Sequence, residues 1–168
     1  MNDARHLIKQ LALQRHPEGG YFRETYRSGE SMAAGKLPER YSGKRQYATA
    51  IYYLLEGEDF SAFHRLLTDE IWHFYAGCSA QLHLLDTSGA YALLKLGTNL
   101  GNGENPQITV PAGTWFAAEP SDKSTFTLVG CTMSPGFDFD DFEMGECQAL
   151  CGQFPEHGDL IRRLIRSS

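Results

Sequence analysis

Three side chains in the sequence are of types that transfer protons in enzymes. His64 and Glu70 lie in one aromatic-rich stretch, and Tyr26 lies in another, nearer the N-terminus. An imidazole beside a carboxylate can act as a general base, because the carboxylate fixes the ring tautomer and favours the charged form. A tyrosine hydroxyl can act as the opposing acid. We therefore take His64, Glu70 and Tyr26 as candidate catalytic residues.

Several aromatic residues share a strand face with these polar groups. Successive side chains of a strand point to opposite faces, so an inward Glu70 places Trp72 and Phe74 inward as well. Phe22, Glu24 and Tyr26 alternate in a similar stretch, so we expect these three to share the inward face of their strand. A few polar groups set against aromatic walls are typical of a small-molecule site. The candidate ligand-binding residues are Phe22, Glu24, Trp72, Phe74 and Phe116.

The same residues also have plain structural interpretations. The aromatic ones can fill a hydrophobic core, and a histidine on a strand can serve as a structural hydrogen-bonding group. An inward Glu70 is harder to explain in this way, because a buried carboxylate is costly unless it is paired.

The composition excludes several classes of partner. The chain has 168 residues, 42% of them hydrophobic, and a net charge of −6, whereas nucleic-acid binding calls for a basic face. Its densest basic stretch, Lys36 to Arg45, is diluted by Glu39 and is interpreted as a solvated loop. No apolar run approaches the roughly 20 residues that span a bilayer. We expect a small-molecule ligand, with no nucleic-acid and no membrane partner.

The four cysteines form no Cys-x-x-Cys pair, and the first residues lack the apolar run of a signal peptide. Reduced thiols in a cytoplasmic protein are therefore expected.

Short segments rich in β-branched and aromatic residues predict an all-β fold with helical ends. Glycine and proline turns separate the predicted strands, and such spacing favours a sandwich or jelly-roll barrel. We expect one domain over residues 1–168, with a core barrel at about 20–135, a helical tail at 138–166 and a long irregular loop at 28–44. The predicted strands are 21–27, 46–56, 60–66, 70–76, 80–86, 91–96, 107–110, 114–119 and 125–133, and the predicted helices are 3–15, 140–154 and 157–165.

Residues 57–77 resemble the first signature motif of the cupin superfamily. That motif has two histidines separated by one residue, then a glutamate and a closing glycine. His64 matches the first histidine, Glu70 the glutamate and Gly77 the glycine, whereas Leu66 replaces the second histidine.

Residues 105–118 resemble the second motif, with Phe116 where the family has a histidine. Together with residues 16–26 and 135–139, the sequence looks like a small RmlC-like cupin family over about residues 5–165. This resemblance implies a double-stranded jelly-roll barrel and a homodimer.

The two replaced histidines of these motifs limit the metal ligands that the chain can offer. A divalent metal in a cupin needs about four imidazole or carboxylate ligands, and Leu66 and Phe116 can donate no lone pair. His73 does not compensate, because it points to the strand face opposite Glu70. We expect no cofactor, and the alternative is a weakly bound divalent metal at His64 and Glu70.

Three functions remain open. Resemblance to the deoxysugar epimerases implies an isomerase or epimerase that moves a proton beside a carbonyl of a sugar-like or polar metabolite, with His64 as base, Glu70 or Glu24 orienting it, and Tyr26 as acid. The first alternative is a ligand-binding module without turnover. The second is a metal-dependent oxygenase or isomerase with irregular ligands.

Overall fold

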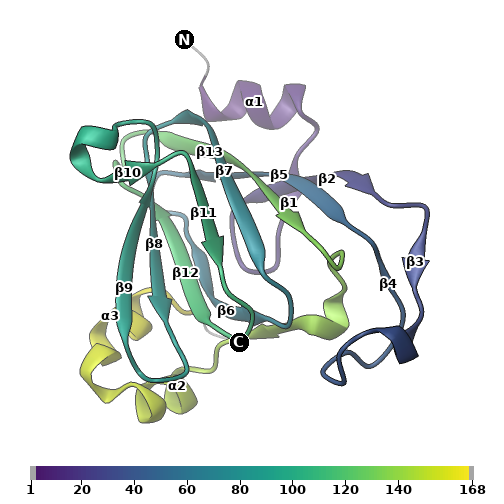
Figure 1. Ribbon diagram of the computed structural model, residues 1–168. Coiled ribbons are helices and arrows are strands. Elements are labelled where there is room, and N and C mark those ends of the chain that lie inside the picture. The colour runs from purple at the N-terminus through teal and green to yellow at the C-terminus, as the bar shows by residue number, and fades with distance from the viewer. Residues whose placement is uncertain (1–2, 167–168) are drawn as a thin grey trace.

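Two six-stranded β-sheets face one another in the structure, a computed structural model that describes residues 3–166 (Figure 1). The first sheet has the order β1-β2-β5-β13-β7-β11, with bounds Gln14–Arg15, Tyr21–Arg27, Thr49–Glu56, Phe126–Met133, Glu70–Gly77 and Gln107–Val110. The second has the order β10-β9-β8-β12-β6-β14, with bounds Glu104–Asn105, Tyr91–Leu96, Ala80–Leu85, Trp115–Pro120, Ser61–Leu66 and Phe142–Met144.

The chain passes repeatedly between the two sheets. Strands β5, β7, β11 and β13 belong to the first sheet, and β6, β8, β12 and β14 belong to the second. This alternation is that of a jelly roll, as the sequence predicts. The two sheets share no strand pairing among the described residues, so the fold is a sandwich of two sheets rather than a closed barrel.

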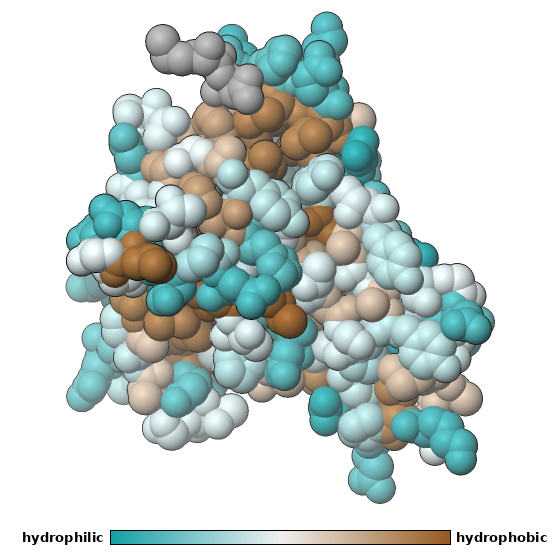
Figure 2. Space-filling model, turned by 45° about the horizontal axis from the view of Figure 1, so that its top comes forward, coloured by the Kyte–Doolittle hydropathy of each residue, from teal (hydrophilic) through white to brown (hydrophobic). Residues whose placement is uncertain are grey.

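Short helices cover the outer faces of the sandwich. Helix α1, Ala4–Gln10, packs on the first sheet, and the hydrophobic surface at the top of Figure 2 lies over it. Helices α2, Cys147–Gln153, and α3, Gly158–Arg163, pack on the second sheet through Leu150, Ile161 and Leu164. The inner faces of both sheets form the main core, which includes Tyr53, Leu82 and Trp72. Four 3₁₀ helices complete the structure: η1 Ala34–Lys36, η2 Leu100–Asn102, η3 Phe139–Asp141 and η4 Pro155–His157.

The predicted strands are confirmed to within a few residues, but two other predictions are wrong. Residues 140–154 do not form one helix, because the strand β14 pairs with β6 before α2 begins. Glu146 then caps α2 by accepting the backbone N–H groups of Gln148 and Ala149. The predicted helix 3–15 likewise ends early, at Gln10.

The stretch 28–44 is not wholly irregular, and the basic stretch Lys36 to Arg45, predicted to be a solvated loop, is buried at Tyr41 and Arg45. The strands β3, Ser31–Met32, and β4, Arg45–Gln46, pair with each other beside the main sheets (Figure 1). Arg45 is buried and donates two hydrogen bonds of 2.6 Å to the carboxylate of Asp141 in η3. This bidentate ion pair anchors the segment to the C-terminal part of the domain.

No helix within residues 3–166 is long and apolar enough to cross a membrane. All four cysteines are free thiols.

Candidate functional site

A cavity of about 340 Å³ opens between the two sheets. The first sheet contributes residues from β2, β5, β7 and β13, and the second contributes residues from β6 and β14. The turn after β1 and the segment before β14 complete the lining. The lining residues are His16, Glu18, Phe22, Glu24, Arg27, Thr49, Ile51, His64, Leu66, Glu70, Cys131, Met133, Phe137, Asp138, Phe139 and Phe142.

His64 lies on β6 with a fixed tautomer. Its Nδ1 lies 2.7 Å from the carbonyl oxygen of Ala62, which can only accept, so Nδ1 carries a proton. Its Nε2 lies 3.3 Å from Oε2 of Glu18. Nε2 therefore faces the Glu18 carboxylate, and an imidazole beside a carboxylate is an arrangement that can give or take a proton.

Glu18 reaches this position from the turn between β1 and β2. Its side chain is buried, and Oε1 accepts a hydrogen bond of 3.0 Å from the hydroxyl of Ser61. His16 lies on the other side, where its Nδ1 accepts the backbone N–H of Glu18 at 3.3 Å. An accepting Nδ1 belongs to a neutral ring, and burial lowers the pKa of His16 despite the attraction of Glu18.

Glu70 is the second carboxyl group of the cavity, and it lies on β7 in the opposite sheet. Burial raises its pKa to about 8, helped by the negative charge of Glu18. The indole Nε1 of Trp72 donates a hydrogen bond of 2.7 Å to Oε2 of Glu70, which favours the ionised form but does not outweigh burial. At neutral pH, Glu70 is therefore a carboxylic acid that can donate a proton.

Charged residues on β2 form another part of the lining. Arg27 donates two hydrogen bonds, of 2.9 and 2.7 Å, to the carboxylate of Glu24 and one of 3.1 Å to the carbonyl oxygen of Phe137. The bond to Glu24 and the nearby charge of Asp138 raise the pKa of Arg27. The charge of Arg27 is thus already shared by two carboxylates.

Of the residues singled out from the sequence, four line the cavity: His64, Glu70, Phe22 and Glu24. Tyr26 does not, since its side chain is 54% exposed. Trp72, Phe74 and Phe116 also lie outside the lining and pack in or against the main core.

Two structural details explain why Tyr26, Trp72 and Phe116 lie outside the cavity lining. The pairing of β2 with β5 shifts register between Glu24 and Tyr26, so the simple alternation that predicts an inward Tyr26 is broken there. Trp72 and Phe116 contact each other edge to face with ring centroids 6.2 Å apart, and they fill the space between the sheets. Trp72 still takes part in the site through its hydrogen bond to Glu70.

His16 and Glu18 line the cavity but are not among the candidate residues predicted from the sequence. They lie in a turn, His16-Pro17-Glu18-Gly19-Gly20, and turns usually run over the surface. The available signal was the pair of glycines, both of which adopt positive φ and let the turn fold against neighbouring backbone.

The comparisons with known proteins agree with this architecture. Residues 5–145 match the family described as Cupin superfamily (DUF985). The chain belongs to this cupin family. A relative in Saccharomyces cerevisiae, the uncharacterized protein YML079W, is 34% identical over 144 residues, which cover 80% of this cupin and 71% of the yeast protein.

Solved structures show the same fold over the full length. The X-ray crystal structure of protein SO0799 from Shewanella oneidensis superposes with a TM-score of 0.90, at 38% identity over all of both chains. A hypothetical protein from Leishmania major gives a TM-score of 0.88 at 33% identity, covering 99% of this cupin and all of that chain.

The metal centre that the cupin fold implies does not fit the residues of this chain. The ring of Phe116 packs against the imidazole of His64 with centroids 4.1 Å apart, where the fold would bring a second imidazole. Leu66 lines the cavity with an alkyl side chain. Within residues 3–166, no three His, Cys, Asp or Glu side chains are grouped as metal ligands would be.

Proposed function

We propose that this cupin binds a small, hydroxyl-bearing metabolite of sugar-like size between its sheets and moves a proton on it, as an isomerase or epimerase does. One observation carries the proposal. A carboxyl group protonated at neutral pH, Glu70, and an imidazole–carboxylate pair, His64 and Glu18, line the same buried cavity. A carboxylic acid that can donate a proton and an imidazole–carboxylate pair that can accept one are the two groups that general acid–base catalysis uses.

The reaction would proceed through an enol. The His64–Glu18 unit takes a proton from the carbon beside a carbonyl, and the electron pair of that C–H bond forms the C=C bond of the enol. The carboxyl of Glu70 delivers its proton to the carbonyl oxygen. In epimerisation, a proton returns to the other face of the same carbon and the enol proton returns to Glu70, which restores both groups. In isomerisation of an α-hydroxy carbonyl compound, a proton returns instead to the former carbonyl carbon, and the proton of the neighbouring hydroxyl passes to Glu70 as the new carbonyl forms.

The charges of the lining favour a neutral ligand. Arg27 is the sole lysine or arginine among the lining residues, and it is paired with Glu24. Glu18 and Asp138 add negative charge, so a phosphate or carboxylate group on the ligand would be repelled. Aromatic rings such as Phe22 and Phe142 provide flat apolar walls for the carbon skeleton of a sugar-like compound.

Solvent deuterium uptake tests the proposal. Neutral aldoses, ketoses and related polyols are incubated with the protein in D₂O, and incorporation at carbon is followed by NMR. We expect uptake with at least one compound that binds, and loss of about a hundredfold or more in His64→Ala and Glu70→Gln, in line with the usual contribution of general acid–base groups.

The matched control is His73→Ala. His73 lies on β7 like Glu70, but it bonds Thr132 and Gln107 and does not line the cavity. Uptake must persist in this variant. Binding without uptake in the wild-type protein contradicts catalysis and leaves the ligand-binding module as the function.

Three further proposals concern the metal content, the oligomeric state and the cellular location of the protein, and each can be measured directly. We propose that no transition metal is required, so elemental analysis should find far less than one per chain, and a stoichiometric metal would restore the metal-dependent alternative. We also propose a homodimer, tested by light scattering, and a cytoplasmic location, tested by fractionation.

A further inference from the structure

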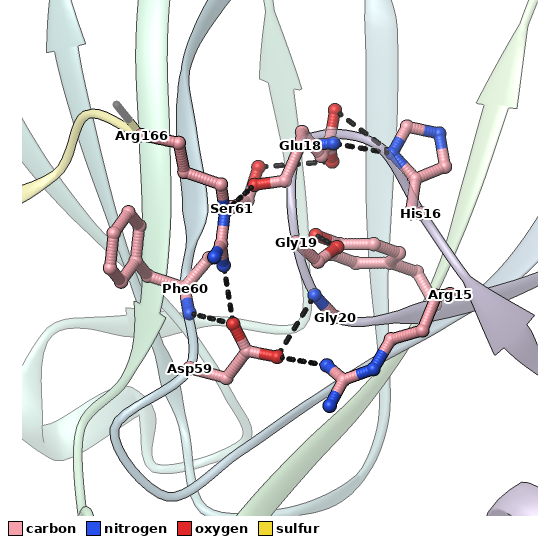
Figure 3. A network of polar contacts seen from close by, with 10 residues as sticks. Arg15, His16, Glu18, Gly19, Gly20, Asp59, Phe60, Ser61 and Arg166 are labelled. Carbon is pink, nitrogen blue, oxygen red and sulfur yellow. Dashed lines mark hydrogen bonds and ion pairs between the residues drawn. The ribbon is translucent and has the colours of Figure 1, made fainter. Parts of the chain in front are cut away.

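Arg166, which follows α3, reaches across to the turn that carries His16 and Glu18 (Figure 3). Its Nε donates a hydrogen bond of 2.9 Å to the backbone carbonyl oxygen of Glu18. One of its terminal nitrogens donates to Oδ1 of Asp59, at 2.5 Å, and to the carbonyl oxygen of Phe60, at 2.9 Å. A single planar guanidinium therefore joins three segments that are distant in sequence.

The turn is shaped to let Arg166 approach. Gly19 has a φ of +119°, which side chains rarely tolerate. A Cβ at this position would collide with the carbonyl oxygen of Phe60 and with the guanidinium of Arg166. The glycine thus gives the backbone both the conformation and the space that this contact needs.

Asp59 ties the other end of the turn to the same group. Its Oδ2 accepts the backbone N–H of Gly20 at 3.1 Å and a hydrogen bond from Arg15 at 2.7 Å (Figure 3). Burial tends to raise the pKa of Asp59, but the hydrogen bonds from Arg166, Phe60 and Gly20 outweigh it and hold that pKa below its ordinary value. Asp59 therefore remains charged, and its bond to Arg166 is charge-assisted at neutral pH.

These contacts fix the backbone on both sides of the Glu18 side chain. The carbonyl oxygen of Glu18 accepts from Arg166 and also from the N–H of Ala62 at 2.9 Å. The carbonyl oxygen of Gly19 accepts a hydrogen bond of 2.7 Å from the hydroxyl of Tyr53. With its backbone held in this way, Glu18 directs its carboxylate inward to Ser61 and His64.

We propose that Arg166 is a positioning residue for the cavity: through the carbonyl of Glu18 and the carboxylate of Asp59, it holds the turn so that the Glu18 carboxylate stays beside His64. The catalytic significance of this contact rests on the proposed function, but the contact itself does not. Within residues 3–166, Arg166 forms no hydrogen bond or ion pair with a side chain that lines the cavity, and it acts through the backbone of the turn.

The titration of Glu70, followed by ¹³C NMR of its carboxyl carbon, tests the proposal in the protein without ligand. The charge of Glu18 raises the pKa of Glu70, so displacement of Glu18 must lower it. We expect Arg166→Ala to lower this pKa toward the value measured in Glu18→Gln. Arg166→Lys, whose single ammonium cannot reproduce the planar fork, should give a value between those of the wild type and Arg166→Ala.

Arg162→Ala is the matched control, because Arg162 lies on α3 and pairs with the exposed Asp159. Its Glu70 titration should equal that of the wild type. If Arg166→Ala lowers the urea midpoint but leaves the pKa of Glu70 unchanged, Arg166 is only a structural tie and the proposal fails. If Arg166→Ala does not fold, Arg166→Lys decides: a lowered pKa supports the proposal, and an unchanged one overturns it.

This result is separable from the proposed function. A cavity that never exchanges deuterium would leave the titration result intact. An unchanged titration in Arg166→Ala would leave the deuterium exchange of the wild-type protein intact.

Discussion

Two buried histidine–glutamate pairs lie on opposite faces of the second sheet. His64 and Glu18 face the cavity, whereas His83 and Glu119 lie on the outer side, where the helical tail packs. In both pairs an imidazole Nε2 lies close to a carboxylate oxygen, at 3.3 Å and 3.0 Å respectively. The pairs differ in what else surrounds the carboxylate.

Glu119 is enclosed by cations. It accepts hydrogen bonds from Arg163 of α3 and from Lys123, in addition to the contact with His83. Burial alone would raise the pKa of Glu119, but these partners hold it well below its ordinary range. The carboxylate is locked in its charged form, and its role is to fasten α3 to the sheet.

Glu18 has no such partners. Among the described residues, its carboxylate contacts Ser61, His64 and His16 but forms no ion pair with a lysine or arginine. A second carboxyl, Glu70, lies near enough to be affected by its charge. The comparison teaches that cations around a buried His–Glu pair fix its carboxylate in the charged form, whereas the pair at the cavity has no such cations and faces a second carboxyl group instead.

The largest expected difference between the two pairs is in how much free energy of unfolding is lost when the glutamate of each pair is replaced. Glu119→Ala leaves Nε2 of His83 without its carboxylate partner and removes the link to Arg163, so we expect a loss of about 3 kcal/mol in the free energy of unfolding. Glu18→Gln should cost less than about 1 kcal/mol, because it also removes the negative charge that makes ionisation of the buried Glu70 unfavourable. Urea denaturation measures both, and equal losses would remove the distinction between the pairs.

The next effect is on the pH dependence of stability. The folded protein keeps the Glu70 proton up to about pH 8, whereas the unfolded chain releases it near the ordinary value of 4.5. The contribution of Glu70 is therefore complete below about pH 4.5 and is lost as pH rises toward 8. Between pH 5 and 7 we expect this to lower stability by about 2 kcal/mol in the wild type relative to Glu70→Gln.

Glu119 gives the opposite slope. Its pKa is lowered on folding, so its contribution is present above the ordinary glutamate value and is lost as pH falls through the lowered folded-state pKa. Denaturation series over pH in wild type, Glu70→Gln and Glu119→Ala separate the two. A wild-type slope between pH 5 and 7 that persists in Glu70→Gln would contradict the assignment to Glu70.

The smallest expected effect on stability is that of removing Lys123, whose ion pair with Glu119 is partly exposed to solvent. Lys123 is one-third exposed, so Lys123→Ala should cost at most about 0.5 kcal/mol while Arg163 and His83 remain on Glu119. Thermal unfolding should show a shift of no more than a few degrees. A loss as large as that of Glu119→Ala would make Lys123 the main support of the network.

The sequence predicts the strands well because their hydrophobic alternation is local information. It also identifies His64 and Glu70 as one constellation, since a fixed motif spacing brings both to the space between the sheets. Glu18 could not be predicted in this way. Its position depends on Arg166, a residue 148 positions away, and on the contacts that Gly19 permits.

Local irregularities account for the other errors. A one-residue register shift after Glu24 turns Tyr26 away from the predicted face. Acidic side chains favour a helix N-terminus, and Asp138, Asp140, Asp141 and Glu143 are the basis for predicting a helix from residue 140. Phe142 and Met144 pair with β6 instead, because their partners on that strand are available only in the folded sheet. Neither the register shift in β2 nor the pairing of β14 with β6 can be recognised from the hydrophobic periodicity of the sequence.

The hydrogen bond from Trp72 to Glu70 couples the fluorescence of the indole to the protonation state of the carboxyl group. The emission of an indole depends on the charge of the group that its N–H faces, so the fluorescence of Trp72 should change as Glu70 gains or loses its proton. The chain's other tryptophan, Trp115, belongs to the cluster beneath the helical tail, under the guanidinium of Arg65. Trp115→Phe would leave a single emitter at the cavity, through which the arrival of a ligand could be followed without any label.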